Sequence, residues 1–302
     1  MQKQDQLATQ LMHNPAMHGS APHHEFDFTD HDFKRICKQI YEHAGIKLSD
    51  VKRDMVYSRV SRRLRAIGLT SFHEYLALLE TDNKGEREAF VNALTTNLTS
   101  FFREPHHFPL LAEHIQKIKS RCPLDIWCCA SSTGEEPYSI AITMMELFKS
   151  YTPPVRILAT DLDTNVLQTA EEGIYAMERV EKLHQEVLKR FFLKGTGRNK
   201  DHVQVRSELR DMITFRQLNL LDPSWAVRGP FDSIFCRNVM IYFDRPTQYD
   251  ILKKFIPVMH QDALLFAGHS ESFQHAVDLF QNRGKTIYTI SQQSLPLASK
   301  VK

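Results

Sequence analysis

The chain of 302 residues predicts an α/β fold with a mostly parallel sheet, preceded by a small all-helical domain and carrying an inserted antiparallel β-subdomain. An apolar run at 126–130 is followed by a turn at Gly134 and then by a helix, which is the opening unit of a nucleotide-binding sheet. Apolar residues recur at helical spacing between 26 and 104. Between about 188 and 214, short runs of alternating character surround a glycine turn, which favours β-strands.

Composition places the chain among ordinary globular proteins, with 42% hydrophobic and 25% charged residues. A net charge of +2 points to no particular partner. The five cysteines form no C-x-x-C pair, and three of them lie in apolar strand-like runs, which predicts reduced thiols in a cytoplasmic protein. No apolar run reaches about 18 residues and no apolar signal segment precedes the helices, so we expect neither membrane insertion nor export.

The N-terminal part of the chain is predicted to be a disordered tail, 1–24, followed by a helical domain, 25–94. The tail is polar and without periodicity. A second flexible tail is expected at 293–302. In the helical domain, capping residues and turns mark four helices, which begin near Thr29, Ser49, Ser71 and Lys84.

The second of these helices carries a basic face. Between 50 and 66, six basic residues stand against two acidic ones, and apolar residues occupy another side of the helix. A solvated helix face and a docking surface for an acidic partner, either a glutamate-rich protein or nucleic acid, both agree with this pattern. The residues that would dock such a partner are Lys52, Arg53, Arg59, Arg62 and Arg63.

The segment 95–107 is predicted to be a linker that contributes to a ligand site. It holds Asn97, Thr99 and Arg103 just before the α/β unit begins. A plain connection between two domains also agrees with this segment, but its Asn, Thr and Arg stand at spacings of two and four. We therefore expect this segment to lie across the mouth of the site.

The turn after the first strand differs from a phosphate-binding loop. It has neither G-x-G-x-x-G nor G-K-[ST], so it offers a pyrophosphate no glycine-lined cradle. Instead Glu135 directly follows Gly134, which favours a ligand that combines a nucleoside with a positive charge, such as S-adenosylmethionine. A second strand ends at Asp161, whose carboxylate can accept both hydroxyl groups of a ribose. Asp163 is expected to cap the next helix instead.

The remaining α/β domain, which spans 108–292, is expected to resume its sheet after the insertion. A strand at 231–236 would bring the residues after it to the ligand side, because ligands bind beyond the carboxyl ends of parallel strands. A helix at 271–280 and a last strand near 286–290 predict an antiparallel edge hairpin. Gly195 and Gly197 of the insertion precede no helix, so a strand edge that accepts an extended peptide is favoured over a phosphate loop.

Six motifs, in this order, resemble those of the chemotaxis receptor glutamate methyltransferases of the CheR family. They cover nearly the whole chain from residue 26 to residue 290. The motifs are T-T-N-x-T-S-F-F-R (95–103), S-T-G-E-E-P-Y-S (132–139), A-T-D-L-D (159–163), N-L-L (219–221), C-R-N-V-M-I-Y-F-D (236–244) and F-A-G-H-S-E (266–271).

The resemblance implies a class I S-adenosylmethionine-dependent methyltransferase fold, a Rossmann-like domain. It implies transfer of a methyl group from S-adenosylmethionine to glutamate side chains of methyl-accepting chemoreceptors, which leaves S-adenosylhomocysteine and uses no metal. Arg103 and Tyr242 would flank the reacting centre, and the roles of Glu135 and Glu136 could be exchanged. The cofactor would lie against Asn97, Thr99, Arg103, Glu135, Asp161, Asn219, Leu220, Arg237 and Asn238.

The same resemblance implies two docking surfaces for the receptor. The basic helix would face the helical cytoplasmic region of the receptor, and the β-subdomain around Gly195 and Gly197 would grip its C-terminal tail peptide. A nucleic-acid methyltransferase is the second interpretation, but the strand end at 237–239 lacks the [N/D]-P-P-[YFW] turn that amino-group methylation needs. A scaffold that binds cofactor and receptor without transferring a methyl group is the third.

A glutamate acceptor explains why the sequence shows so little catalytic apparatus. Its carboxyl group has an ordinary pKa of about 4.3 and is already an anion at neutral pH, so no general base is required. The enzyme would align the carboxylate oxygen, the methyl carbon and the sulfur, and would exclude water.

Overall fold

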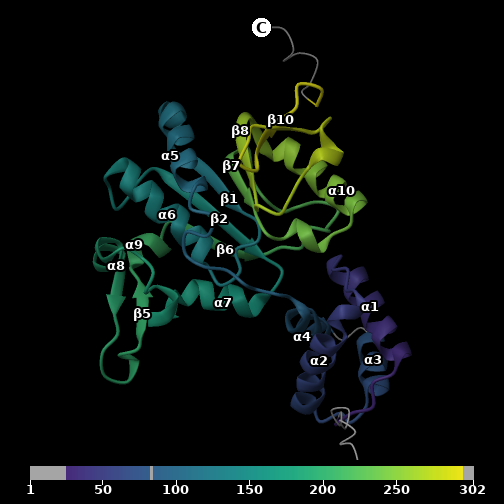
Figure 1. The fold of residues 1–302 in the computed structure, drawn as a ribbon. Coiled ribbons are helices and arrows are strands. Elements are labelled where there is room, and N and C mark those ends of the chain that lie inside the picture. Colours follow the sequence, from purple (N-terminus) through teal and green to yellow (C-terminus); the bar gives the residue numbers. More distant parts are fainter. Residues whose placement is uncertain (1–24, 82–83, 295–302) are drawn as a thin grey trace, which may run out of the picture.

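The computed structural model describes residues 25–81 and 84–294. The expected N-terminal tail and residues 295–302 of the expected C-terminal tail lie outside these residues. Two parts of the described chain are plain in Figure 1: a helical domain at the lower right, and an α/β domain that carries a small β-subdomain at its left.

The helical domain contains α1 (Asp30–Ala44), α2 (Arg53–Ile67), α3 (Phe72–Glu80) and α4 (Lys84–Leu94), with a short 3₁₀ turn, η1 (Asp50–Lys52), before α2. The expected starts are confirmed at Thr29, which caps α1 in a capping box with Asp32, and at Ser71, which caps α3. Apolar side chains at helical spacing meet in one core, and those without any exposure include Ile36, Ile40, Val56, Val60, Leu64, Tyr75 and Phe90.

The α/β domain is built on a seven-stranded sheet with the strand order β6-β2-β1-β7-β8-β10-β9. The first five of these strands run parallel, and β10 and β9 are antiparallel to their neighbours. The strands are β1 (Leu124–Cys128), β2 (Val155–Asp161), β6 (Ile213–Gln217), β7 (Phe231–Cys236), β8 (Met259–Ala267), β9 (Phe280–Asn282) and β10 (Ile287–Ile290). The mostly parallel sheet predicted from the sequence is confirmed, and its strand order, with β1 at the centre of the five parallel strands, is that of a Rossmann-like domain.

Both faces of the sheet are covered, which is why its central strands are apolar on both sides. Along β1, Ile126 and Cys128 join the core under α5 and α6, and Trp127 joins the core under α10. The period of two along the strand therefore assigns its side chains to opposite layers. The covering helices are α5 (His107–Ile118), α6 (Glu135–Phe148), α7 (Thr164–Glu172) and α10 (Arg245–Phe255).

The β-subdomain is a separate three-stranded antiparallel sheet with the order β3-β5-β4. It begins at Ile174, earlier than the expected 188, because β3 pairs with a strand almost thirty residues further along the chain. Ile213 lies in the main sheet instead, where it pairs with Ile157. The elements of the subdomain are β3 (Ile174–Ala176), η3 (Met177–Arg179), α8 (Gln185–Phe191), β4 (Phe192–Lys194), η4 (Gly197–Asn199) and β5 (His202–Val205); the short helix α9 (Ser207–Arg210) leads back to the main sheet.

The expected helix at 271–280 is wrong. Only a 3₁₀ turn, η7 (Gln274–Ala276), is present there, and Phe280 begins the edge strand β9. Phe273, Ala276 and Leu279 are all buried at a spacing of three, so a 3₁₀ segment leading into a strand produced a pattern like that of a helix. The expected antiparallel hairpin at this end of the sheet is confirmed, with β10 between β8 and the edge strand.

Hydrogen bonds join the helical domain to the carboxyl-end side of the sheet. Tyr41 donates to Asp244 at 2.8 Å, and Asn219 donates to the carbonyl oxygen of His43 at 2.9 Å. Thr164, at the start of α7, donates to Glu88 of α4 at 2.6 Å. Among the helices of residues 25–81 and 84–294, none is long and apolar enough to cross a membrane.

Candidate functional site

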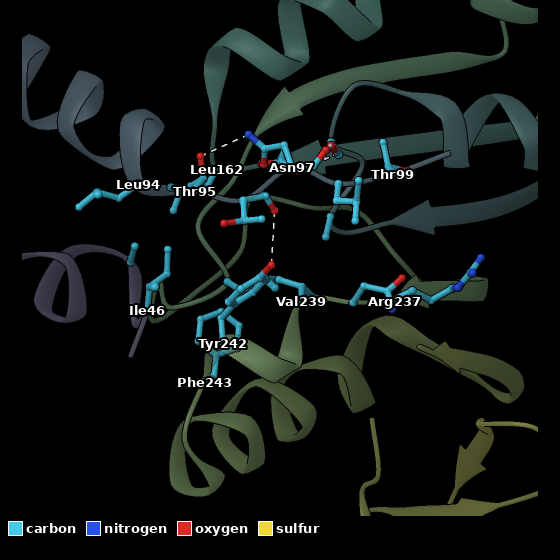
Figure 2. A pocket seen from close by; sticks show the side chains of 18 of the residues that line it. Ile46, Leu94, Thr95, Asn97, Thr99, Leu162, Arg237, Val239, Tyr242 and Phe243 are labelled. Atoms are coloured by element: carbon cyan, nitrogen blue, oxygen red, sulfur yellow. Dashed lines mark hydrogen bonds between the residues drawn. The ribbon is translucent and has the colours of Figure 1, made fainter. Parts of the chain in front are cut away.

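A cavity of about 230 Å³ lies where the helical domain meets the carboxyl ends of β1, β2 and β7. Its walls come from both domains and from the linker. Figure 2 shows Asn97 and Thr99 of the linker on one side and Val239 and Tyr242 on the other. This is the edge of the sheet at which α/β proteins bind their ligands.

Most of the residues predicted to contact a cofactor lie in the wall of this cavity, and Glu135 does not. The lining also includes Tyr242, predicted to be catalytic, and Lys52, which directly precedes α2. The predicted cofactor residues that line it are Asn97, Thr99, Arg103, Asp161, Asn219, Leu220, Arg237 and Asn238.

Asp161 and Asp163 end the same strand but take different roles. Asp163 accepts from the backbone N–H of Asn165 at 2.9 Å and caps α7, which confirms its predicted role. Asp161 accepts from the backbone N–H of Ser132 at 2.8 Å and of Asp163 at 3.0 Å. Burial raises the pKa of Asp161, and these two N–H groups oppose the rise. Its carboxylate is thereby fixed beside the cavity, with lone pairs left for a ligand.

The linker is held against the turn that follows β1. Asn97 donates to Asp163 at 2.7 Å, and its carbonyl oxygen accepts from the hydroxyl of Ser132 at 3.1 Å. The backbone N–H of Phe102 donates to the hydroxyl of Ser139 at 2.9 Å. These bonds place Arg103 in the cavity wall, where its guanidinium donates to the carbonyl oxygen of Leu98 at 2.8 Å.

Arg237 is the buried cation of the site. Its side chain has no exposure, and its guanidinium nitrogens lie 2.9 Å from a carboxylate oxygen of Glu136 and 3.4 Å from one of Glu104. It also donates to the carbonyl oxygen of Arg103. Arg237 therefore joins the first turn of α6 to the linker, and its charge is offset by two carboxylates.

Glu104 was not singled out from the sequence. Burial alone would raise the pKa of its carboxyl group. The charge of Arg237 and hydrogen bonds from His269 and Asn238 outweigh this and bring the pKa down to about 2. Glu104 therefore stays ionised at physiological pH, beside the positive charge that it balances.

Glu271 was also missed, although it ends a quoted motif. Its carboxylate accepts from the backbone N–H groups of Asn238, Val239, Met240 and Gly268, at distances between 2.5 and 2.9 Å. Asn238 has a φ of 58°, a strained conformation that these bonds hold in place. The four bonds fix the loop that carries Asn238 and Tyr242 into the cavity wall. The sequence offered one signal for Glu271: it follows, by three residues, the glycine that comes directly after β8.

The two consecutive glutamates at the start of α6 point to different surroundings. Glu136 lines the cavity and pairs with Arg237. Burial raises its pKa, against the effect of that arginine. Glu135 is fully buried on the other side, where it contacts Arg179 and accepts from the hydroxyl of Thr133 at 2.6 Å. The sequence left open which of the two glutamates faces the ligand site. In the structure, Glu136 lies next to the cavity and Glu135 does not.

Three of the arginines predicted to dock a partner are paired within the protein. Arg63 donates to the buried Glu86 at 2.6 Å, and Arg53 pairs with Asp30 at 2.6 Å. Arg59 donates to the carbonyl oxygens of Ala93 and Thr95, at the end of α4. Lys52 and Arg62 are exposed, and no ion pair of either is found within the described residues. Most of the arginines on the basic face therefore stabilise the helical domain itself.

Gly195 and Gly197 form the turn between β4 and β5. A Cβ atom on Gly195 would lie 2.0 Å from the carbonyl oxygen of Asn199, and Gly197 has a φ of 58°. Both positions thus require glycine for the turn itself. The turn joins an edge strand of the β-subdomain to its centre strand.

Burial of His107 is expected to make the stability of the protein depend on pH. The ring has no exposure, and burial lowers its pKa to about 4, so the folded protein holds it neutral. In the unfolded chain this histidine takes up a proton near pH 6.5. The contribution of the buried neutral ring to the stability of the folded protein is therefore complete above pH 6.5 and is lost as the pH falls toward 4. We expect the free energy of unfolding to fall over this window by up to about 1.4 kcal/mol per pH unit.

Urea unfolding at a series of pH values measures this slope. His107→Gln should flatten it, whereas His73→Gln, on the exposed side of α3, should leave it unchanged. An unaltered slope in His107→Gln would contradict the assignment.

Nothing in the described ranges gathers three or more histidine, cysteine or carboxylate side chains in an arrangement able to hold a metal ion.

Comparison with known proteins gives two family matches that together cover most of the chain. Residues 31–95 match the CheR methyltransferase all-alpha domain, and residues 97–289 match the CheR methyltransferase SAM-binding domain. The boundary between the matches falls in the linker. Both domains seen in the structure therefore have counterparts in one family.

Two curated relatives match over most of their length. The chain is 51% identical over 265 residues to a chemotaxis protein methyltransferase of Salmonella typhimurium, covering 87% of this chain and 91% of that protein. It is 50% identical over 266 residues to chemotaxis protein methyltransferase 2 of Pseudomonas aeruginosa, covering 88% of this chain and 95% of that protein.

Proposed function

Because the chain belongs to the CheR family of S-adenosylmethionine-dependent methyltransferases, we propose that it methylates glutamate side chains of chemoreceptors and so serves adaptation in bacterial chemotaxis. The observation that carries the proposal is the cavity at the carboxyl ends of the strands, whose wall contains Arg103 and the carboxylates of Glu136 and Asp161. The products would be a glutamate methyl ester and S-adenosylhomocysteine.

The residues around the cavity fit such a cofactor. Asp161 keeps lone pairs for the two ribose hydroxyl groups, and Glu136 offers a carboxylate for the ammonium group of the methionine part. Leu220 supplies an apolar wall for the adenine ring, and Asn219 and Asn238 supply polar groups beside it. When bound, the cofactor supplies an electrophilic methyl group on a positively charged sulfur.

The protein itself needs only to position and desolvate the acceptor. A glutamate carboxylate is already ionised at neutral pH, so no residue has to remove a proton. We propose that Arg103 holds this carboxylate by charge-assisted hydrogen bonds, and that Tyr242 closes the opposite side of the site. Tyr242 fits this role because its hydroxyl donates across the cavity to the carbonyl oxygen of Thr96, at 3.5 Å (Figure 2).

The partner proposed is the helical cytoplasmic region of methyl-accepting chemoreceptors. The exposed Lys52, which also lines the cavity, and Arg62 suit a glutamate-rich helix. A receptor tail peptide would add to an edge of the β-subdomain, β3 or β4, by strand pairing. The proposal includes a cytoplasmic location and no nucleic-acid substrate. The internal pairing of Arg53, Arg59 and Arg63 weakens the case for nucleic acid further.

The experiment supplies the purified protein with labelled S-adenosylmethionine, receptor-containing membranes and total RNA. We expect label on the receptors as an ester that base removes. Label on RNA would instead support the nucleic-acid interpretation. Cofactor binding without any transfer would support the scaffold, and either of these results would contradict the proposal.

A further inference from the structure

The β-subdomain touches the cofactor site through the turn that follows β1. Tyr175 of β3 donates from its hydroxyl to the carbonyl oxygen of Thr133 at 2.7 Å. Arg179 of η3 donates to the hydroxyl of Thr133 at 3.3 Å and contacts the carboxylate of Glu135. Two side chains of the subdomain therefore grip one turn of the main domain.

This turn has two sides with different surroundings. On one side, Ser132 and Glu136 line the cavity, and the backbone N–H of Ser132 orients Asp161. On the other side, Thr133 and Glu135 face the β-subdomain. A shift of the turn on the second side must move the ligand-facing groups on the first.

Glu135 explains why Arg179 is needed. The side chain of Glu135 has no exposure, whereas that of Arg179 is 40% exposed. Besides Arg179, the hydroxyl of Thr133 and the N-terminal end of α6 favour the negative charge of Glu135. A carboxylate buried without its cation is strongly unfavourable, so without Arg179 the turn would have to open and let water reach Glu135.

Close packing leaves the turn little freedom to adjust. Gly134 has a φ of 97°, and a Cβ atom there would lie 2.8 Å from the Cβ of Ala170 and 2.9 Å from the hydroxyl of Tyr175. Phe101 of the linker packs edge-on against the ring of Tyr175, with 5.1 Å between ring centroids. The same tyrosine thus supports two walls of the cavity.

We infer that Arg179 and Tyr175 are positioning residues for the cofactor site. From the β-subdomain they hold the turn between β1 and α6 in the form that binds the cofactor, and they thereby set its affinity. This inference goes beyond the proposed function, because it concerns cofactor affinity and holds whatever the methyl acceptor is. It assigns a second role to a subdomain whose edges are proposed to dock a peptide.

The experiment measures S-adenosylhomocysteine binding by calorimetry, which needs no acceptor. Arg179→Ala should weaken binding about tenfold, equivalent to about 1.4 kcal/mol. Arg198→Ala, which removes the same charge from an exposed position of the same subdomain, should leave the affinity within about twofold. In turnover assays with a fixed acceptor, Arg179→Ala should raise KM for the cofactor and leave kcat nearly unchanged.

A second substitution separates positioning from general damage. In the Arg179→Ala background, Glu135→Gln removes the uncompensated charge and should restore most of the lost affinity. Tyr175→Phe keeps the ring packing but loses one hydrogen bond, and should weaken binding about threefold. If Arg179→Ala binds like the native protein, or if Glu135→Gln restores nothing, the inference is wrong. Should Arg179→Ala fail to fold, an unchanged affinity in Tyr175→Phe would overturn it.

Discussion

Replacing Arg103 with alanine is expected to reduce methyl transfer by at least about 100-fold while the protein stays folded. Arg103 lines the cavity, and its guanidinium donates to a carbonyl oxygen of the linker. No carboxylate partner of Arg103 is found in the part of the chain that the structure describes. Arg237, by contrast, is neutralised by two glutamates. Arg103 is therefore the arginine that remains available to bind the carboxylate of an acceptor.

The measurement is the initial rate of receptor methylation, with thermal unfolding as the test of folding. Arg103→Lys keeps the charge but loses the planar guanidinium group, and its methylation rate should lie between that of the native protein and that of the alanine variant. Arg228→Ala, at an exposed position outside the cavity wall, is the matched control and should be fully active. A folded Arg103→Ala protein with a near-native rate would refute the assigned role.

Replacing Arg237 with methionine is expected to have the largest effect on stability, a loss of about 3–5 kcal/mol. The substitution would leave Glu104 and Glu136 buried near each other without the cation that they share. It would also release the carbonyl oxygen of Arg103 and so loosen the linker wall. Binding of S-adenosylhomocysteine should be lost together with stability.

Urea unfolding and calorimetry distinguish the two effects. Adding Glu104→Gln and Glu136→Gln to the methionine variant removes the unpaired charges and should restore most of the stability. It should not restore cofactor binding, because Glu136 is itself part of the cavity wall. A methionine variant as stable as the native protein would show that the buried cluster contributes far less than its burial indicates.

The features that the sequence predicted well are those decided by nearby residues. The cap of α1 at Thr29 and the cap of α7 at Asp163 depend on backbone groups within three residues. The course of β1 follows from its apolar run, and the ligand side of the sheet follows from the ends of its strands. Asp161 could therefore be assigned to the cavity wall from the sequence.

The choice between Glu135 and Glu136 could not be made in this way. Consecutive residues of a helix point about 100° apart, so either side chain could face the ligand. What decides is a partner for each that is distant in the sequence: Arg237 pairs with Glu136, and Arg179 of the inserted subdomain contacts Glu135. Long-range contacts of this kind leave no local pattern.

The arginines of α2 illustrate the same limit. Their clustering predicted a docking surface, yet Arg63 binds Glu86 and Arg59 binds the end of α4. Both partners lie more than twenty residues away in the sequence, in or just after α4. A basic stripe on a helix shows where charge gathers but not which charges are already paired.

The cavity takes its lining from the helical domain, the linker and the α/β domain together. A ligand that binds such a cavity stabilises the docked arrangement by RT ln(1 + [L]/Kd), while separated domains gain nothing from it. The methyl donor would thus stabilise the arrangement in which the two domains are docked. With ligand in excess, the two domains should melt in one cooperative transition at a higher temperature, so the supply of donor would set how often they come apart.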